Sequence, residues 1–176
     1  MTGYAYFADT NNQSVTVTTN ADQGIKIETR FRDGNLASLM GTATFPLRYA
    51  YGTVSDGGAV RAFTTEIKLD ASGTDTLESS QMLTDGAGRN YKTIFADSAS
   101  LESFFDRKGR LWKKVDPDGV VMLFTNNARG ELEYSCVDSN RNDVMNFAGQ
   151  DRITRRITDV VSGPHSTNVI RTRTYV

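Results

Sequence analysis

The stretch Ala62-Phe63-Thr64-Thr65-Glu66-Ile67-Lys68-Leu69 alternates between apolar and polar side chains. Phe63, Ile67 and Leu69 fall on one side of an extended chain, whereas Glu66 and Lys68 fall on the other. A hydrophobic period of two is typical of a β-strand with one face covered, whereas a helix would show a period of 3.6. The stretch therefore predicts a half-buried strand.

The same alternation returns along most of the chain, and turn-forming residues separate the alternating runs. β-branched and aromatic residues fill the runs, as a pleated surface prefers, and helix signals are thin throughout. The chain is therefore predicted to be all-β and antiparallel. The further runs are 15–17, 25–27, 47–51, 111–115, 120–124, 132–136 and 169–175, and the turn signals include Asp33-Gly34-Asn35, Asp56-Gly57-Gly58 and Asp118-Gly119.

Three glycines repeat at a constant spacing. Gly88, Gly109 and Gly130 are 21 residues apart, and an Asp or Asn precedes each of them by three positions. Aspartate accepts local backbone hydrogen bonds and glycine adopts the positive φ that a reversal needs. Each unit is therefore predicted to consist of a turn, a strand, a second turn and a second strand. The predicted structural turn residues are Asp85, Gly88, Asp106, Gly109, Asp116, Asp118, Gly119, Asn127 and Gly130.

These units resemble the RHS or YD-repeat family. The matching stretches are Phe105-Asp106-Arg107-Lys108-Gly109-Arg110-Leu111, Asp116-Pro117-Asp118-Gly119 and Asn127-Ala128-Arg129-Gly130-Glu131-Leu132, with a diverged copy over 31–52. The resemblance implies a β-strand ribbon, in part solenoid-like or shell-like, from a large bacterial protein that is secreted or on the cell surface. It also implies that the motif residues are structural.

The resemblance divides the chain into three predicted parts. Residues 1–83 form a diverged β region that holds the 31–52 copy, and residues 84–137 hold three 21-residue repeats. Residues 138–176 hold an Asn- and Asp-rich loop followed by C-terminal strands. The array is predicted to be interrupted over roughly 53–80, because the first copy is not in register with the others.

Charge and hydropathy exclude two classes of partner. Lys and Arg number 20 against 21 Asp and Glu, giving a formal net charge of −1, whereas nucleic-acid binding favours a basic stripe. No apolar run is long enough to span a membrane as a helix. The N-terminal residues show no leader, and we expect the chain to be part of a longer exported protein. The single cysteine, Cys136, is expected to be a buried apolar residue.

The sequence offers no catalytic constellation, so we expect no enzyme. The lone His165 lies in a turn-like stretch, and no Gly-x-Ser-x-Gly motif provides a nucleophile beside it. Asp116 and Asp118 flank a proline and precede a glycine, which favours a turn over a pair of catalytic carboxylates. A hydrolase remains the third-ranked interpretation, and no cofactor site is predicted.

One polar cluster has the spacing of a calcium loop. Oxygen side chains occupy its positions 1, 3, 5 and 9, and a backbone carbonyl is available at position 7. The alternative is a polar loop that interrupts the repeats. The predicted calcium ligands are Asp138, Asn140, Asn142, Val144 and Asn146.

The first functional hypothesis is a non-catalytic scaffold, a shell wall or a presentation surface, whose partner is the rest of the parent polypeptide or an enclosed polypeptide. The second is a carbohydrate- or cell-surface-binding β-domain that uses Trp112 or exposed tyrosines. Strand-like sequences at residues 3–7 and 169–176 also predict unpaired sheet edges, and hence a homodimer formed through edge strands.

Overall fold

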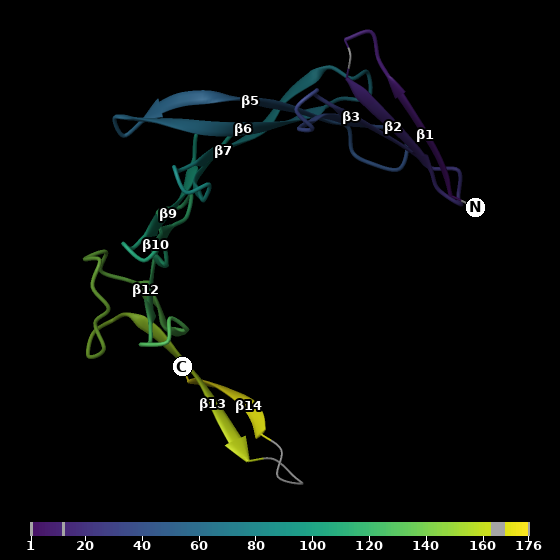
Figure 1. Ribbon diagram of the computed structural model, residues 1–176. Coiled ribbons are helices and arrows are strands. Elements are labelled where there is room, and N and C mark those ends of the chain that lie inside the picture. The colour runs from purple at the N-terminus through teal and green to yellow at the C-terminus, as the bar shows by residue number, and fades with distance from the viewer. Residues whose placement is uncertain (1, 12, 163–167, 176) are drawn as a thin grey trace. The chain divides into compact units, whose positions relative to one another are not determined.

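The computed structural model describes residues 2–11, 13–162 and 168–175, and its secondary structure there is all strand and turn (Figure 1). The predicted all-β, antiparallel class is thereby confirmed. His165 lies outside the described residues. The strands of the antiparallel sheet follow one another in chain order from β1 to β14. No helix in the described part of the chain has the length and apolar character needed to cross a membrane.

The chain divides into two compact units, residues 1–99 and 100–176. The first unit contains β1 to β8, and every extensive contact in it joins strands consecutive in the chain. It is thus a single layer of sheet. Its strands are β1 Gly3–Ala8, β2 Ser14–Thr19, β3 Ile25–Arg30, β4 Leu36–Met40, β5 Leu47–Asp56, β6 Ala59–Leu69, β7 Asp75–Thr84 and β8 Asn90–Phe95.

Long strands mark the middle of the first unit, and Figure 1 shows β5, β6 and β7 as its long neighbouring arrows. The β5–β6 hairpin turns on Gly57 and Gly58, with φ of 58° and 77°. Two positive φ angles in a two-residue loop suit the twist of a tight hairpin. Across β5 and β6, Gly52 pairs with Phe63, whose ring occupies the space that a Cβ at Gly52 would fill.

The second unit contains β9 to β14, again with extensive contacts only between consecutive strands. Its described core is a cross-strand cluster of Val121, Leu123 and Cys136, covered by Met145 from the loop that follows β12. Its strands are β9 Ser100–Phe105, β10 Leu111–Val115, β11 Val121–Asn126, β12 Leu132–Asp138, β13 Arg152–Ser162 and β14 Asn168–Tyr175.

Few side chains are buried in either unit. Among the described residues, the buried apolar side chains are Val15, Ala37 and Leu83 in the first unit and Val121, Leu123 and Cys136 in the second. Asp138 is the buried charged residue, with 2% of its surface exposed. In each unit, both faces of the described part of the sheet therefore remain largely open to solvent.

Candidate functional site

The predicted turn residues lie in hairpins that share one hydrogen-bond pattern. In each, the first residue donates its N–H to the carbonyl of the fifth and accepts at its own carbonyl from the N–H of the fourth. This is a type I turn closed by a bulge whose fourth residue has a positive φ. Gly88, Gly109, Gly119 and Gly130 occupy that fourth position, with φ between 75° and 86°.

In two of these turns, the aspartate at the first position accepts hydrogen bonds from backbone N–H groups of its own turn. Asp85 Oδ1 accepts from the N–H groups of Ala87 and Arg89, and Asp106 Oδ1 accepts from those of Lys108 and Arg110. The second carboxylate oxygen then pairs with the arginine at position five, at 2.6 Å for Asp85–Arg89 and 2.7 Å for Asp106–Arg110. These bonds, that from the Arg89 side chain above all, lower the pKa of Asp85 to about 2.

The turn at Asn127 keeps this geometry with different side chains at positions one and five. Asn127 Oδ1 accepts from the N–H groups of Arg129 and Glu131, and its Nδ2 donates to Glu131 Oε2 at 2.8 Å. A neutral donor has replaced the carboxylate, and an acid has replaced the arginine at position five. Glu131 stands where the Asp85 and Asp106 turns have an arginine, and it preserves the link between positions one and five.

The same turn occurs beyond the three glycine repeats. Phe31–Gly34, in the diverged copy, and Phe95–Ser98 form the full pattern. So do Asn20–Gln23 and Asp70–Gly73, where no turn was predicted, the latter inside the predicted interruption. For Asp70 the Asp-x-x-Gly spacing was a usable signal. Gln23 and Ser98, each with φ of 67°, replace the glycine in their turns, so a glycine search could not find those two.

A second β-bulge, in the strand that follows the turn, accompanies four of these turns at one fixed position. The strand register skips one residue, which lies six positions after the first residue of the turn. The skipped residues are Ala37, Tyr91, Trp112 and Glu133. The Asp116 turn has no such bulge, because Val115–Val121 and Lys114–Met122 pair in regular register beside it. From β9 to β12, a regular turn therefore lies between two turns that carry this bulge.

Asp116 and Asp118 both belong to the turn between β10 and β11. Asp116 Oδ1 accepts from the N–H of Val120 at 2.7 Å, and Asp116 also makes the two backbone bonds of the turn. This carboxylate is committed to closing the turn.

The predicted calcium ligands lie at the end of β12 and in the loop between β12 and β13, where backbone N–H groups donate to their oxygens. Asp138 accepts from the N–H groups of Asn142 and Asp143, Asn140 Oδ1 from that of Asn142, and Asn142 Oδ1 from that of Val144. Asn146 directs its amide nitrogen toward Asn142 Oδ1 and the Val144 carbonyl. Among the described residues, no three His, Cys, Asp or Glu side chains converge as metal ligands. Calcium binding here stays a prediction.

Two aspartates fasten this loop at its ends. Asp138 holds Asn142 and Asp143, and Asp151 accepts from the N–H groups of Ser139 and Asn146. Cys136 lies beneath the loop with 1% of its surface exposed, and burial followed by the nearby Asp151 charge raises the pKa of its thiol to about 11. A buried thiol with a raised pKa is a poor nucleophile.

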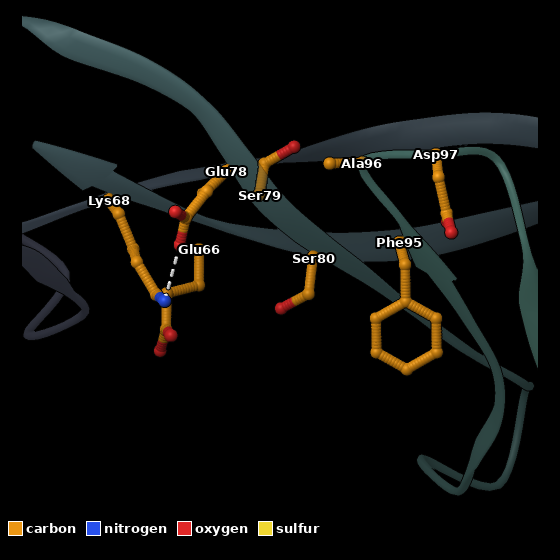
Figure 2. Close-up of a pocket in the computed structure, with 8 residues that line it drawn as sticks. All are labelled: Glu66, Lys68, Glu78, Ser79, Ser80, Phe95, Ala96 and Asp97. Atoms are coloured by element: carbon orange, nitrogen blue, oxygen red, sulfur yellow. Dashed lines mark hydrogen bonds and ion pairs between the residues drawn. The ribbon is translucent and has the colours of Figure 1, made fainter.

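A hollow of about 520 Å³ lies over β6, β7 and β8 in the first unit (Figure 2). Glu66, Ser80 and Phe95 form a cross-strand row in it. Lys68 Nζ lies 2.5 Å from Glu78 Oε2, the dashed contact in Figure 2, and this hydrogen bond raises the pKa of Lys68 and lowers that of Glu78.

Each glutamate of the hollow is thus engaged. Tyr49 donates its hydroxyl to Glu66 at 2.9 Å, and burial, then this bond, raises the pKa of Tyr49 to about 12. Glu66 and Glu78 project from neighbouring strands on the same face of the sheet. General acid–base catalysis of glycoside cleavage uses two carboxyl groups that flank a substrate from opposite sides. The hollow provides a mixed polar and aromatic surface, which suits contact with a ligand or a polypeptide.

Exposed aromatic side chains form a second surface, in the second unit. Tyr134, Arg155 and Tyr175 are a cross-strand row on β12, β13 and β14. Phe147, 68% exposed, meets Tyr134 edge-on at 5.2 Å between ring centroids. The Arg155 guanidinium lies 5.2 Å from the centre of the Tyr134 ring. Sequence alone could not have indicated this row, since its three members come from separate strands and meet only through the register between them.

Trp112, named by the carbohydrate hypothesis, occupies the bulge of β10 with 37% of its surface exposed. Its ring is 6.2 Å from that of Phe104, and Lys113 Nζ lies near both rings while it pairs with Asp143 at 2.6 Å. The tryptophan thus belongs to a packed cluster and still offers part of its ring to solvent.

Comparison of the whole chain with protein-family models and with curated proteins finds no match.

Proposed function

We propose that this chain is a non-catalytic structural segment of a larger protein of the RHS/YD-repeat kind, in which it serves as a shell wall or presentation surface. The observation that carries the proposal is the small buried core, with three buried apolar side chains described in each unit. Stable domains pack two or more layers of secondary structure around one core. A single-layer sheet obtains such a core when another polypeptide covers one of its faces.

The recurrent turns support the same proposal. Their polar side chains and backbone groups bind one another within each turn, as Asp85 and Asp106 bind Arg89 and Arg110, and so they stabilise hairpins rather than a substrate. From β9 to β12, the same bulged turn occurs twice with a regular turn between, so one local structure is repeated along the chain. Repeat units of this kind bury their apolar surface by stacking against neighbours.

The partner expected from this proposal is the rest of the parent polypeptide, or a polypeptide that the shell encloses. The parent is expected to be bacterial and to be secreted or held at the cell surface. Uncovered strands at such a surface suit extended contact with another chain, because edge and face pairing both use backbone and side-chain groups that are already exposed.

The natural gene product tests this proposal. Antibodies against the chain should detect, in the cells that make it, a polypeptide several times longer than 176 residues. In that polypeptide the segment should resist proteases under native conditions. A natural product no longer than this chain would overturn the scaffold proposal, and so would turnover of a substrate abolished by one substitution among its carboxylates.

Carbohydrate binding is the second candidate function, and the neighbouring aromatic side chains of Tyr134, Phe147 and Tyr175 favour it. Aromatic faces stack on the apolar faces of sugar rings, and an amphipathic tyrosine adds a hydrogen-bonding group. A glycan array probed with the chain, with Phe147→Ala and Phe45→Ala as the test and control variants, separates the two candidates. Phe45 is also exposed, at 85%, but lies in the first unit.

A further inference from the structure

The loop between β12 and β13 lies on one face of the sheet in the second unit. Its Met145 packs against the side chains of Val121, Leu123 and Cys136. Successive side chains of a strand point to opposite faces of the sheet. We call the face that carries these residues the loop face. The opposite face, which carries their sequence neighbours such as Met122, we call the bare face.

A row of paired residues crosses the bare face from β9 to β13. It consists of Ser103, Lys114, Met122, Val137 and Arg152, each paired with the next across neighbouring strands. Phe124 and Arg156 lie on the same face, because each is an even number of positions from a member of the row in its own strand. Lys114, Met122 and Phe124 are half-buried, whereas Arg152 and Arg156 are exposed. The bare face thus combines half-buried apolar side chains with three cations.

On the loop face, the described cations of the strands have acidic partners within the chain. The loop supplies one of these partners, and the strands supply the others. The ion pairs are Lys113–Asp143 at 2.6 Å, Arg155–Glu133 at 2.7 Å, and Arg171 and Arg173 with Asp159 at 2.6 and 2.9 Å. The charges of this face are therefore balanced by the chain itself.

On the bare face, the cations lack such partners. Lys114 and Arg156 directly follow Lys113 and Arg155 in the sequence and so project from the other side of the sheet. In the described part of the chain, none of Lys114, Arg152 and Arg156 forms an ion pair. Complementary charge determines which partner an interface selects. Three unpaired cations beside half-buried apolar side chains therefore favour an acidic partner.

A hollow of about 290 Å³ adjoins Arg156 on this face. The acid at its margin, Glu133, already pairs with Arg155. An arginine guanidinium donates two parallel hydrogen bonds to a carboxylate, and hydroxyl groups donate further ones. The hollow therefore suits a carboxylate of the partner. The hydroxyl groups that line it belong to Ser135, Thr154, Thr172 and Thr174.

We propose that the bare face of the second unit binds an acidic segment of the parent polypeptide. Apolar side chains of that segment cover Met122 and Phe124, and its carboxylates pair with Lys114, Arg152 and Arg156. The inference rests on the proposed function, and it specifies the chemistry and the location of the covering polypeptide. Among acidic partners, a segment of the same polypeptide has the highest effective concentration at this face.

Zero-length cross-linking tests the partner of the bare face. A carbodiimide joins a lysine amine to a carboxylate only where the two groups are in contact. In the full polypeptide purified from the cells that make it, Lys114 should be joined to an Asp or Glu of that polypeptide outside this chain. In the isolated chain this link should be absent. Lys113 is the matched control, because it should be joined to Asp143 in both settings.

The outcomes of this experiment separate the two proposals. A Lys113–Asp143 link with no link from Lys114 to an outside acid would overturn the docking proposal and leave the scaffold proposal standing. A link from Lys114 to a second copy of the chain or to a separate protein would overturn the assignment of the occupant. A natural product no longer than this chain would overturn both proposals.

Removal of the three cations is a second test, independent of cross-linking. The triple variant Lys114→Gln, Arg152→Gln and Arg156→Gln should leave the melting temperature of the isolated chain nearly unchanged, because these side chains have no acidic partner there. In the full polypeptide, native-state protease cleavage within residues 100–176 should become about tenfold faster. The control triple variant removes the same charge from turn and loop positions and should not change cleavage. It consists of Arg107→Gln, Lys108→Gln and Arg141→Gln. Equal cleavage of the two triple variants would contradict the proposal.

Discussion

Single residues in the hairpin turns stabilise the local structure of this chain, and the aspartate at the first turn position makes that stability depend on pH. The pKa of Asp85 is about 2 in the folded chain, below the ordinary value of 3.8, mainly because of its hydrogen bonds from Arg89. A carboxylate with a lowered pKa stabilises the fold above its unfolded pKa, and this stabilisation disappears as the pH falls through the folded value.

The free energy of unfolding should therefore decrease between about pH 4 and pH 2. In Asp85→Asn this decrease should be smaller, as measured by urea unfolding at several pH values. Asp97→Asn is the matched control, because Asp97 accepts one backbone bond from Ala99 and has no arginine beside it in its turn. Identical pH profiles for Asp85→Asn and the unsubstituted chain would contradict this account of the turn.

Two substitutions at the fourth turn position should have opposite effects on the stability of the chain. Gly109 has φ of 78° and Ser98 has φ of 67°. A residue with a Cβ loses about 1–2 kcal/mol in this conformation. Gly109→Ala should therefore destabilise the chain by about that amount, and Ser98→Gly should stabilise it by up to about 1 kcal/mol. Gly86→Ala in the Asp85 turn is the control, since its φ is not positive and a Cβ there meets nothing. Thermal unfolding measures all three.

At the scale of the hairpin, the link between the first and fifth turn positions should be exchangeable. Arg110→Glu places a second acid beside Asp106 and should destabilise the chain by about 0.5–1 kcal/mol. Adding Asp106→Asn should recover most of this loss, because the pair then reproduces the Asn127–Glu131 hydrogen bond. Denaturant unfolding of the two single variants and the double variant gives the coupling free energy between positions 106 and 110. Additive effects would show that the two positions do not interact.

The loop between β12 and β13 provides the calcium prediction. Calcium that binds only the folded chain raises its melting temperature as the concentration increases. We expect a higher melting temperature in excess calcium than in chelator, and no such difference in Asn140→Ala. Asn140 is a suitable test because its side chain contributes one hydrogen bond to the loop, to the N–H of Asn142. Equal melting curves for the unsubstituted chain would reject the calcium site.

Sequence patterns predicted the elements better than the surfaces. Alternation in Ala62–Leu69 identified β6, because a strand with one covered face alternates apolar and polar side chains along its own sequence. The turn at Asp70 was missed although it has the Asp-x-x-Gly spacing, and the turn at Ser98 has no glycine. The bulge at Trp112 and the row of Tyr134, Arg155 and Tyr175 depend on register between strands, which no single strand encodes.

At the scale of the whole molecule, the proposal that another polypeptide completes the chain rests on a single-layer arrangement of strands with few buried side chains in each unit. Backbone amides in a sheet with open faces exchange quickly, because few buried contacts oppose local opening. The same amides exchange more slowly once a second layer covers the sheet. The scaffold proposal therefore makes a claim about the difference between the isolated chain and the chain in its natural setting.

Amide hydrogen exchange, measured by mass spectrometry on the isolated chain and on the full polypeptide in which its cells make it, tests that claim most directly. We predict that peptides from β5 to β7 and from β9 to β12 exchange at least about tenfold more slowly in the full polypeptide, a change of about 1.4 kcal/mol in opening free energy. Equal exchange of these strands in the two settings would contradict the account.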